Sequence, residues 1–571
     1  MRTRDDKYIM ILLGVCFFSL ILFLGNALFN TKGEPREAVV AVSMLKYGNW
    51  ILPVNNGVDI AYKPPFFHWC IAFFSLLAGH VSEFTSRLPS ALSLTAMVLV
   101  AFKFYAKRRS PQLALLTCLV TLTSFEMHRA GTNCRVDMVL CSLTVISLFQ
   151  LYKWGEKDQR GVPLTAILCM SGAFLTKGPV GIILPCLVAF VYLWIRGKSF
   201  VRLLYTFALT ALGACVLPAC WYVAAYMQGG DTFLQLIYEE NVLRFLGKMT
   251  YSSHEAPFYY NFVTVIAGYV PYTLLVLISL FALRYKMPAG TPRDLWNRLR
   301  DYVRNMDDAR LFSLLSIAVI FVFYCIPKSK RSVYLLPIYP FIAYFLAEYI
   351  IYLAKRRRVV IRSFGYTLSV LSVLLVATLA CVRMRLIPES IFTGKHADEN
   401  IAFMNALATT HIGAVQLAAI VLPLVAALIF WLYRHKSLQV QIYSMLGIIF
   451  AVFFSLDGFY NPTVLNVKSD KPVALRIKEI VSDRRIYSYD PNVVEGNPLR
   501  QFSINFYLND NVVPFEAVTP ESGYVLAGDD VMNTFKEEYP AYKVTEIEDF
   551  NHKSCDNKKM LHLYIVEKTA R

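Results

Sequence analysis

The chain has 571 residues, of which 56% are hydrophobic and 17% are charged, and its formal net charge is +17. Soluble domains carry about 25% charged residues, so this composition excludes an ordinary soluble protein and predicts a polytopic membrane protein. Most lysines and arginines flank apolar runs, where they are expected to set membrane topology. The positive charge therefore does not indicate a nucleic-acid partner.

The first apolar run covers residues 8–29 and follows Arg2, Arg4 and Lys7. It is longer than the apolar core of a signal peptide, about 7–15 residues, so we expect an uncleaved anchor that starts in the cytoplasm. Later runs are also long enough, or nearly so, to cross a bilayer, which takes about 20 residues. These runs cover 66–82, 88–106, 112–127, 137–153, 162–176, 179–195, 203–227, 260–283, 310–326, 332–354, 361–382, 412–433 and 439–456.

Basic clusters assign the ends of these runs to the two sides of the membrane. Residues 107–109, 284–309 and 355–358 are strongly basic and are expected in the cytoplasm. They agree with a cytoplasmic N-terminus only if one early run does not cross. We expect 66–82 to lie on or dip into the outer face, which leaves about 13 transmembrane helices.

Beyond residue 465 the chain changes character. Helical spacing at 474–481 and 531–538 alternates with short strand-like segments, which is typical of a small α/β domain. We therefore predict a transmembrane domain (1–456) with an outer catalytic loop and juxtamembrane helices at 30–87, followed by a periplasmic α/β domain (457–571). The strand-like segments cover 485–489, 502–508, 512–518, 524–527, 543–547 and 561–566.

Several cations fall on the predicted outer face and so break the usual topology rule. A group of outward-facing cations is suited to holding a phosphate or pyrophosphate, because arginine makes bidentate contacts and lysine supplies a point charge. Some of them are expected to be ordinary interface residues. The outer cations are Arg36, Lys63, Arg129, Arg135, Lys177, Lys328, Lys330 and Arg331.

Short motifs that contain these residues follow one another in a fixed order. They are Gly33-Glu34-Pro35-Arg36, Tyr62-Lys63-Pro64-Pro65, Arg135-Val136-Asp137-Met138, Thr176-Lys177-Gly178-Pro179 and Pro327-Lys328-Ser329-Lys330. Their order and spacing over nearly the whole chain resemble the GT-C membrane glycosyltransferases. The resemblance is to the bacterial group that includes the aminoarabinose transferase acting on lipid A, a relative of the protein O-mannosyltransferases.

This resemblance implies a GT-C fold in the bacterial inner membrane, with an active site that faces outward. It implies a polyprenyl-phosphate-linked sugar as donor, inversion at the anomeric carbon, and no direct use of a nucleotide sugar. The acceptor is expected to be lipid A, another glycolipid or a glycan, with a protein hydroxyl as the alternative.

One position departs from the family pattern. The pattern in the first loop is Asp-Glu-x-Arg, and here Gly33 replaces the Asp, so that only Glu34 and Arg36 remain. Either Glu34 takes the role of the missing carboxylate or the chemistry needs no base there. A phosphate acceptor is already ionised at neutral pH, whereas a sugar or serine hydroxyl must lose a proton.

The resemblance and the charge pattern together suggest roles for named residues. Glu34 is a candidate base, or an orienter of the acceptor or of Arg36, and Asp137 is a candidate contact for the acceptor or a sugar hydroxyl. Lys63 is a candidate clamp that stabilises charge on the leaving phosphate; the alternative is a lysine that reaches to lipid headgroups. For Asp137, the alternative to a substrate contact is an ion pair with a neighbouring arginine. The further candidates for substrate or phosphate binding are Arg36, Tyr62, Lys177, Lys328 and Arg135.

Neither the residues nor the resemblance requires a cofactor. His254 next to Glu255 is the one candidate for a metal ligand, and the alternative is a loop histidine that bonds locally, because a structural zinc site wants about four ligands. Two other classes of protein remain as rivals, a transporter of lipid-linked sugars and a non-catalytic envelope scaffold. Transporters often show repeated halves, and we find no such repeat in this sequence.

Overall fold

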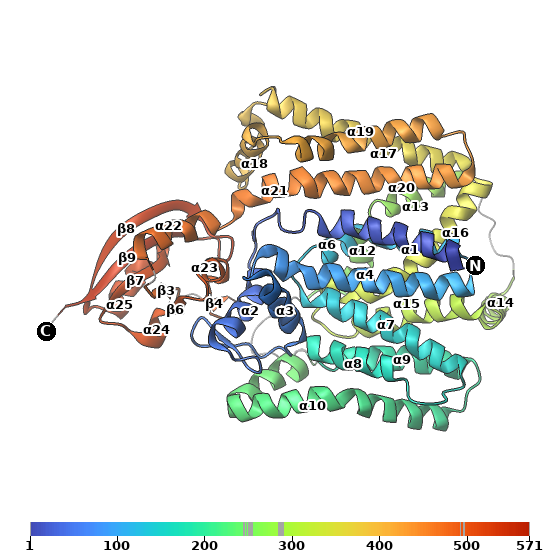
Figure 1. Ribbon diagram of the computed structural model, residues 1–571, viewed down its shortest axis with the longest axis horizontal. Helices are drawn as coiled ribbons and strands as arrows, with labels where there is room; N and C mark the ends of the chain where they lie inside the picture. The colour runs from blue at the N-terminus through green and yellow to red at the C-terminus, as the bar shows by residue number, and fades with distance from the viewer. Residues whose placement is uncertain are drawn as a thin grey trace.

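A computed structural model describes residues 2–243, 246, 248, 255–283, 290–482, 484–491, 493–494, 497–498 and 500–569. Long helices lie side by side in a bundle (Figure 1). A small domain with a β-sheet lies at one end of the bundle, and the N-terminus lies at the other end.

Eight helices in the described part of the chain are long and apolar enough to cross a membrane, or nine if a pair bent by 95° forms one span. The bent pair consists of α12 (Tyr260–Gly268) and α13 (Tyr272–Ala282). The eight are α4 (Glu83–Arg108), α7 (Val136–Glu156), α10 with η2 (Phe200–Leu243), α15 (Asp308–Cys325), η3 with α16 (Ser332–Arg356), α17 (Arg358–Arg383), α19 (Ala414–Tyr433), and α20 with its helical continuation (Leu438–Lys468).

Shorter apolar helices account for the remaining predicted runs. They are α3 (Phe66–Ala78), α5 (Pro111–Leu122), α8 (Leu164–Lys177) and α9 (Val180–Ile195), and the N-terminal run forms α1 (Arg2–Cys16) with η1 (Phe17–Ile21). The polytopic helical fold is therefore confirmed, whereas the number of crossings stays a prediction. The run predicted at 66–82 forms the short helix α3, which lies beside α2 (Pro35–Tyr47) at the end of the bundle near the sheet domain (Figure 1).

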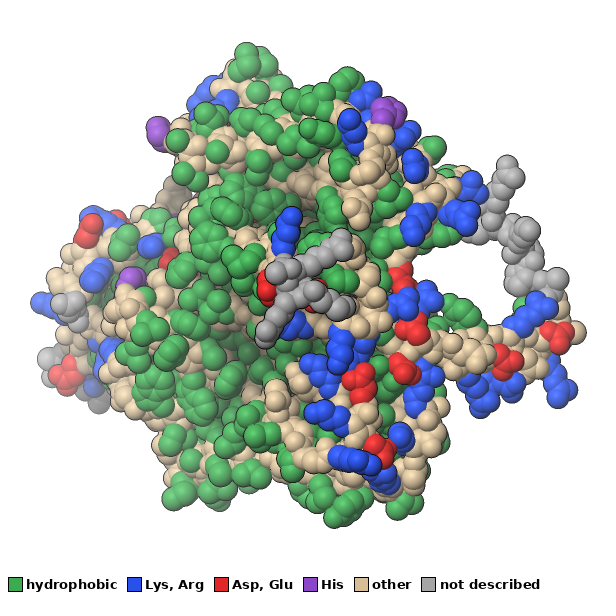
Figure 2. Space-filling model, turned by 45° about the vertical axis from the view of Figure 1, so that its right-hand side comes forward, with side chains coloured by type: hydrophobic (Ala, Val, Ile, Leu, Met, Phe, Trp, Pro, Cys, Tyr) green, Lys and Arg blue, Asp and Glu red, His purple; other side chains and the backbone are tan. Residues whose placement is uncertain are grey.

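One end of the bundle is rich in basic side chains. Lysine and arginine side chains gather around the end that carries the N-terminus, whereas the flanks are mostly hydrophobic (Figure 2). Ion pairs cross-link this end: Arg109 contacts Asp307 at 3.1 Å and Glu348 at 2.9 Å, and Arg310 contacts Glu348 at 2.9 Å. The amphipathic helix α14 (Pro292–Arg304) also lies here, with Trp296 exposed. This distribution matches the basic face that the sequence assigns to the cytoplasm.

The C-terminal domain is built on a five-stranded mixed sheet in the order β6-β3-β7-β9-β8. Strand β3 pairs in parallel with β6 and β7, and strand β9 pairs antiparallel with β7 and β8. The small α/β domain predicted from the sequence is thus present. The strands are β3 (Ile486–Tyr489), β6 (Val512–Pro514), β7 (Ser522–Gly528), β8 (Tyr542–Lys553) and β9 (Met560–Lys568), and the helices are α22 (Lys471–Val481), α23 (Phe502–Tyr507), α24 (Phe515–Val518) and α25 (Met532–Glu538).

Two predicted strands of this domain are wrong in part or in whole. Residues 502–508 form the helix α23 instead of a strand, and only the first part of 512–518 is a strand. Short apolar runs do not distinguish strand from helix by periodicity. The start of α23 depends on a distant residue, because the Ser503 N–H donates to the Asp556 carboxylate at 2.7 Å. The predicted boundary at residue 456 also falls inside a helical segment, which continues to Lys468.

The sheet domain is fastened to the first outer loop. Arg500 donates to Asp59 at 2.9 Å, and the ring of Phe506 lies 4.8 Å from the ring of Phe29. The turn Asn56-Gly57 between β1 (Val54–Asn55) and β2 (Asp59–Ile60) has positive φ angles of 51° and 73°. A Cβ at Gly57 would approach Val513 Cγ2 to 3.0 Å, so glycine permits the close contact of this turn with the sheet domain.

Candidate active site

The first outer loop places its charged residues by starting a helix. Pro35 occupies the first position of α2, where its missing N–H costs nothing and its fixed φ suits the helix. Glu34 and Arg36 therefore flank the helix start, and Glu37 lies in the first turn. The helix ends at Gly48, which adopts a left-handed φ of 73°.

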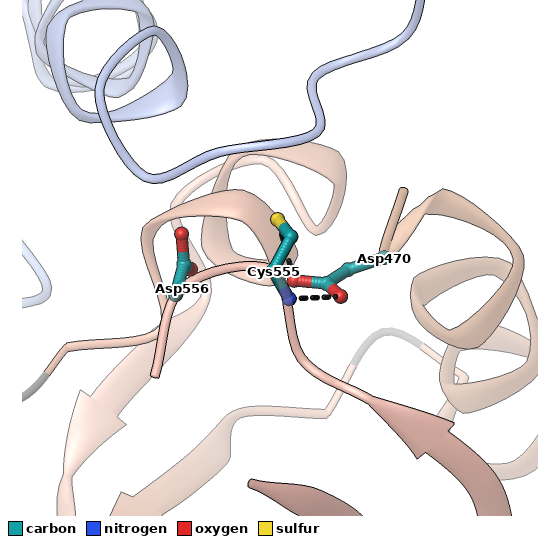
Figure 3. A group of neighbouring side chains, drawn as sticks. All are labelled: Asp470, Cys555 and Asp556. Atoms are coloured by element: carbon teal, nitrogen blue, oxygen red, sulfur yellow. Dashed lines mark hydrogen bonds between the residues drawn. The ribbon is translucent and has the colours of Figure 1, made fainter. Parts of the chain in front are cut away.

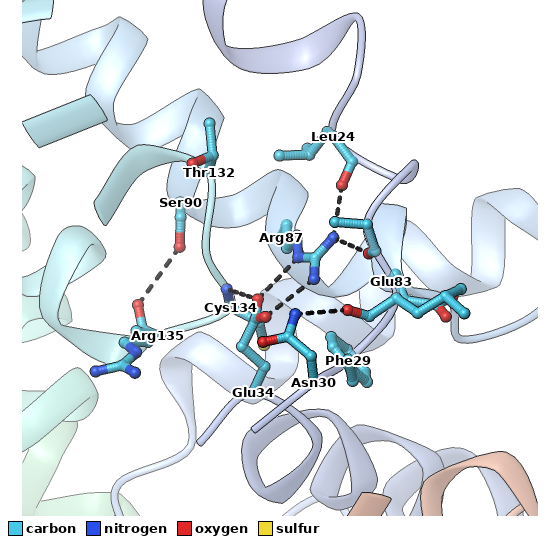
Figure 4. Close-up of polar contacts among 12 residues, drawn as sticks. Leu24, Phe29, Asn30, Glu34, Glu83, Arg87, Ser90, Thr132, Cys134 and Arg135 are labelled. Atoms are coloured by element: carbon cyan, nitrogen blue, oxygen red, sulfur yellow. Dashed lines mark hydrogen bonds and ion pairs between the residues drawn. The ribbon is translucent and has the colours of Figure 1, made fainter. Parts of the chain in front are cut away.

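Glu34 is buried in a network that ties four segments together (Figure 4). Its carboxylate accepts two hydrogen bonds from Arg87, at 2.8 and 2.9 Å, and a third from the Cys134 N–H at 2.8 Å. Arg87 also donates to the carbonyl oxygens of Leu24 at 2.9 Å and Ala27 at 2.5 Å. The pair thus locks the end of the first span and the start of α2 to α4 and to the segment before α7.

These contacts bear on the candidate role of Glu34 as a base. Burial opposes ionisation of Glu34, but the charge and hydrogen bonds of Arg87 outweigh burial and lower the pKa of the carboxyl. A carboxylate held by three donors is a weak proton acceptor. The contacts favour the positioning role for Glu34, and the base role stays a prediction that they do not support.

A second buried carboxylate, that of Glu37, lies among three basic side chains. Its Oε1 atom accepts hydrogen bonds from Lys63 and, at 3.2 Å, from Arg36, and its Oε2 atom lies 3.0 Å from His68 Nε2. Glu37 and His68 are buried, whereas the Lys63 side chain is 31% exposed and that of Arg36 is 40% exposed. The two cations therefore lie above Glu37 and remain accessible.

Sequence reasoning assigned no role to Glu37 or Arg87. A side chain in the first turn of a helix points back toward the preceding loop, but the sequence does not show that Glu37 meets His68, 31 positions away. Arg87 lies in α4, two positions before Pro89, and only the fold shows that it reaches Glu34, 53 positions away in the sequence.

The electrostatic setting of Lys63 is unusual for a lysine. Burial and the neighbouring Arg36 cation lower the pKa of Lys63 to about 8, and Glu37 partly opposes them. Burial likewise opposes ionisation of Glu37, but Lys63, His68 and Arg36 outweigh it and hold the pKa of this carboxyl well below its usual range. Near neutral pH the cluster thus contains two cations and one anion.

Asp137 and Lys177 form a second ion pair nearby. Asp137 lies in the first turn of α7 and Lys177 in the last turn of α8, so each charge complements the dipole of its own helix. The Lys177 ammonium also lies 4.2 Å from the ring centre of Tyr334, in η3. Asp137 interacts electrostatically with Lys63, which joins the two ion pairs into one cluster.

Arg135 lies where the family pattern would place the missing carboxylate. A Cβ at Gly33 would be 3.3 Å from Arg135 Nη2, so the guanidinium fills the space beside this glycine. In the part of the chain that the structure describes, the Arg135 side chain has no hydrogen bond or ion pair, and its Nε atom is buried without a partner. It interacts electrostatically with Glu34 and Asp137.

The structure brings together some of the predicted site residues and leaves others apart. Tyr62 is half-buried and within electrostatic reach of Arg36. The side chain of Lys328 is exposed and makes no ion pair with any described residue, although its carbonyl oxygen accepts from the Ala256 N–H at 3.3 Å. His254 lies outside the described residues, so the metal prediction stays open.

Another cluster with metal-binding side chains lies in the sheet domain. Asp470, Cys555 and Asp556 are buried, with one ligand atom of each within 4.8 Å of the others (Figure 3). Asp470 already accepts hydrogen bonds from the Cys555 N–H at 3.0 Å and from His552 at 2.9 Å. Burial and the nearby Asp470 raise the pKa of Asp556 to about 8. We interpret this cluster as a hydrogen-bonded contact that fixes the turn before β9 to α22 and α23.

Comparison with known proteins adds a second line of evidence. Residues 62–222 match the family model described as dolichyl-phosphate-mannose-protein mannosyltransferase. This segment contains Lys63, Arg135, Asp137 and Lys177.

The sequence matches to curated relatives cover only part of each relative. An uncharacterized protein of Aquifex aeolicus is 28% identical over 60% of this chain and 64% of its own length. The undecaprenyl phosphate-alpha-4-amino-4-deoxy-L-arabinose arabinosyl transferase 2 of Proteus mirabilis is 26% identical over 61% of this chain and 60% of its own. The chain thus matches less than two thirds of the length of these relatives.

The fold agrees over the whole chain. The crystal structure of ArnT from Cupriavidus metallidurans bound to undecaprenyl phosphate superposes with a TM-score of 0.69, at 19% identity, over 98% of this chain and 97% of that one. The protein therefore shares the fold of ArnT over nearly its whole length, and part of its sequence is similar to the arabinosyl transferases and to the mannosyltransferase model.

Proposed function

We propose that the protein is an inverting glycosyltransferase of the bacterial inner membrane. It transfers a sugar from a polyprenyl-phosphate donor to lipid A, another glycolipid or a glycan on the periplasmic face. The observation that carries this proposal is the charge cluster at the end of the bundle next to the sheet domain. There the pairs Glu37–Lys63 and Asp137–Lys177 lie beside two further cations, Arg36 and Arg135.

The reaction needs positive charge where this cluster supplies it. The acceptor oxygen attacks the anomeric carbon from the face opposite the phosphate, and the bond from that carbon to the phosphate oxygen breaks. The electron pair of this bond stays on the phosphate, whose negative charge increases in the transition state. Preorganised cations at that oxygen stabilise the transition state more than the ground state. Lys63 is assigned to the leaving phosphate, with Arg36 beside it.

Asp137 and Lys177 are assigned to the sugar. A lysine–carboxylate pair offers both donors and acceptors to hydroxyl groups, and Tyr334 under Lys177 offers a ring face. Tyr62 precedes Lys63 and is assigned to the same face of the donor. Lys328 is assigned a phosphate contact through the family motif alone.

The carboxylates of the cluster favour one class of acceptor. Glu34 is held by Arg87, Glu37 by Lys63 and Asp137 by Lys177, so each is paired with a cation. A carboxylate held in this way removes protons poorly. An acceptor whose attacking oxygen is already ionised, such as a phosphate on a glycolipid, needs no such base. The paired carboxylates therefore favour lipid A or a related phosphoglycolipid as the acceptor.

A protein hydroxyl is the second candidate acceptor. It is favoured by the match of residues 62–222 to the protein mannosyltransferase model. A hydroxyl acceptor would require a base, which the paired carboxylates supply poorly.

Comparative mass spectrometry of envelope glycolipids and glycoproteins tests the proposal. Cells would carry the wild-type protein, no protein, Lys63→Ala, or the control Lys395→Ala, an exposed lysine between α17 and α18 (Ala397–Thr409). One glycolipid species should lose a single sugar mass in the null and Lys63→Ala strains and keep it in the control strain. Loss of the sugar from a protein would identify the second candidate. An unchanged envelope in the null strain would contradict the transferase function.

A further inference from the structure

Glu37 lies at the centre of the donor-binding cations, and nothing in the family pattern gives a role to this position. The pattern has its carboxylate at position 33, where this chain has glycine. Glu37 follows one helical turn later, and its side chain is 5% exposed, beneath Lys63 and Arg36. The chain therefore keeps a carboxylate in this part of the site, although at another position.

We infer that Glu37 is a positioning residue for the proposed transfer, whose buried carboxylate holds the Arg36 and Lys63 cations side by side toward the donor phosphate. This inference rests on the proposed function. Glu37 does not contact the reacting atoms, because the two cations cover it.

Two like charges do not stay together in a partly buried site without an anion between them. Arg36 cannot lose its proton, but Lys63 can. Repulsion from Arg36 therefore favours the neutral form of Lys63. Glu37 Oε1 accepts from both cations, which offsets their repulsion and fixes their positions. The cluster retains one unit of excess positive charge, and this excess is what a phosphate would bind.

His68 holds the carboxylate in place from the other side. Its ring is 1% exposed, and the Nε2–H tautomer donates to Glu37 Oε2 at 3.0 Å. Among the described residues, the Nδ1 atom is buried without a hydrogen-bond partner. Both Glu37 oxygens are thus engaged, so the carboxylate is oriented before any ligand arrives.

The protonation of Lys63 gives the inference a specific signature. The groups that act on Lys63 are Arg36 and Glu37 from α2, Glu240 from η2 and Asp137 from α7. Burial and Arg36 already lower the pKa of Lys63 to about 8. Glu37 raises it, so removing this anion lowers the Lys63 pKa further. The Glu37→Gln variant should therefore lose the Lys63 cation at a lower pH than the wild type.

The first readout uses the full chain in detergent micelles and needs no substrate. The rate of acylation of Lys63 by acetic anhydride, followed by mass spectrometry across pH 6–10, reports the Lys63 pKa. We expect the midpoint in Glu37→Gln to fall by about one pH unit or more. The control Glu389→Gln, an exposed carboxylate outside the cluster, should leave it unchanged. An unchanged midpoint in Glu37→Gln overturns the inference.

The second readout is binding of undecaprenyl phosphate to the same proteins. At pH 8 the Glu37→Gln variant should bind about ten-fold more weakly than the wild type, and the deficit should shrink as the pH falls. Adding Lys63→Arg to Glu37→Gln should remove this pH dependence, because arginine stays charged. A deficit that is equal at every pH would show a merely structural role and would overturn the inference. A wild-type protein that does not bind the probe at all would contradict the proposed function, and the acylation midpoints would still decide the role of Glu37.

Discussion

At the scale of single residues, two buried carboxylates one helical turn apart have different tasks. Glu34 joins segments of the fold through Arg87, and Glu37 faces the accessible cations. The motif Gly33-Glu34-Pro35-Arg36 directs attention to Glu34. The contacts instead favour a role at the cation site for Glu37, which lies in the first turn of α2.

The Glu34–Arg87 pair should behave as a structural lock. Arg87→Ala leaves a buried carboxylate without its cation, which costs about 3–5 kcal/mol. Replacing both partners, in Glu34→Gln with Arg87→Met, should cost less than Arg87→Ala alone, because no charge remains buried. Thermal unfolding in detergent measures both effects. If Glu34→Gln abolished transfer while the protein unfolded at the wild-type temperature, Glu34 would be the base and the lock assignment would be wrong.

Lys177 and Asp137 provide a prediction about substrate binding. Lys177→Ala should weaken donor binding by about ten-fold, since the ammonium and its contact with Tyr334 are lost together. Lys177→Arg should retain most of the affinity, because it preserves the charge and the contact with the ring. The Michaelis constant for the donor measures this effect. Equal constants in Lys177→Ala and the wild type would place the sugar elsewhere.

At the scale of elements, the sheet domain holds the first outer loop in position. The partly buried ion pair of Arg500 and Asp59 connects the two. A double-mutant cycle with Arg500→Ala and Asp59→Ala should give a coupling free energy on the order of 1 kcal/mol. Each single variant should also reduce transfer, because the loop carries the cations assigned to the donor phosphate in the proposed function. Strict additivity of the two unfolding free energies would show that the pair does not couple the domain to the loop.

Asp556 makes the stability of the sheet domain depend on pH. The raised pKa means that the folded domain keeps this proton up to about pH 8, whereas the unfolded chain loses it near pH 4. The stabilisation is complete below pH 4 and is lost as the pH rises toward 8, by about 1.4 kcal/mol per pH unit. Asp556→Asn should remove this dependence and still accept from the Ser503 N–H. Melting temperatures at pH 5 and pH 8 test it, and an identical pH dependence in variant and wild type would contradict the assignment.

The elements themselves differ in how far the sequence predicts them. Long apolar runs give the spans, because crossing a bilayer imposes both length and composition. The helix α23 is missed, because the Ser503 N–H in its first turn depends on Asp556, which is 53 positions away. The role of Glu37 is missed for a similar reason. Its partner His68 lies on another helix, and no local pattern reports that contact.

At the scale of the whole molecule, the two ends of the bundle have different tasks. The N-terminus and α14 lie at the basic end, and the candidate site lies at the other end, between the bundle and the sheet domain (Figure 1). A cysteine introduced at Asn305 or at Lys395, after the exposed native Cys220 is removed, should add labelling by a membrane-impermeant maleimide above that of the parent only at Lys395 in intact spheroplasts. Labelling at Asn305 instead would invert the proposed orientation.

The most direct test of the central claim is transfer by the purified protein. It would be reconstituted with an undecaprenyl-phosphate-linked sugar and lipid A, and both products would be followed by mass spectrometry. The account predicts that glycosylated lipid A and free undecaprenyl phosphate appear in equal amounts, and that Lys63→Ala loses this activity while Lys395→Ala keeps it. Full activity in Lys63→Ala would contradict the claim that this cluster stabilises the leaving phosphate.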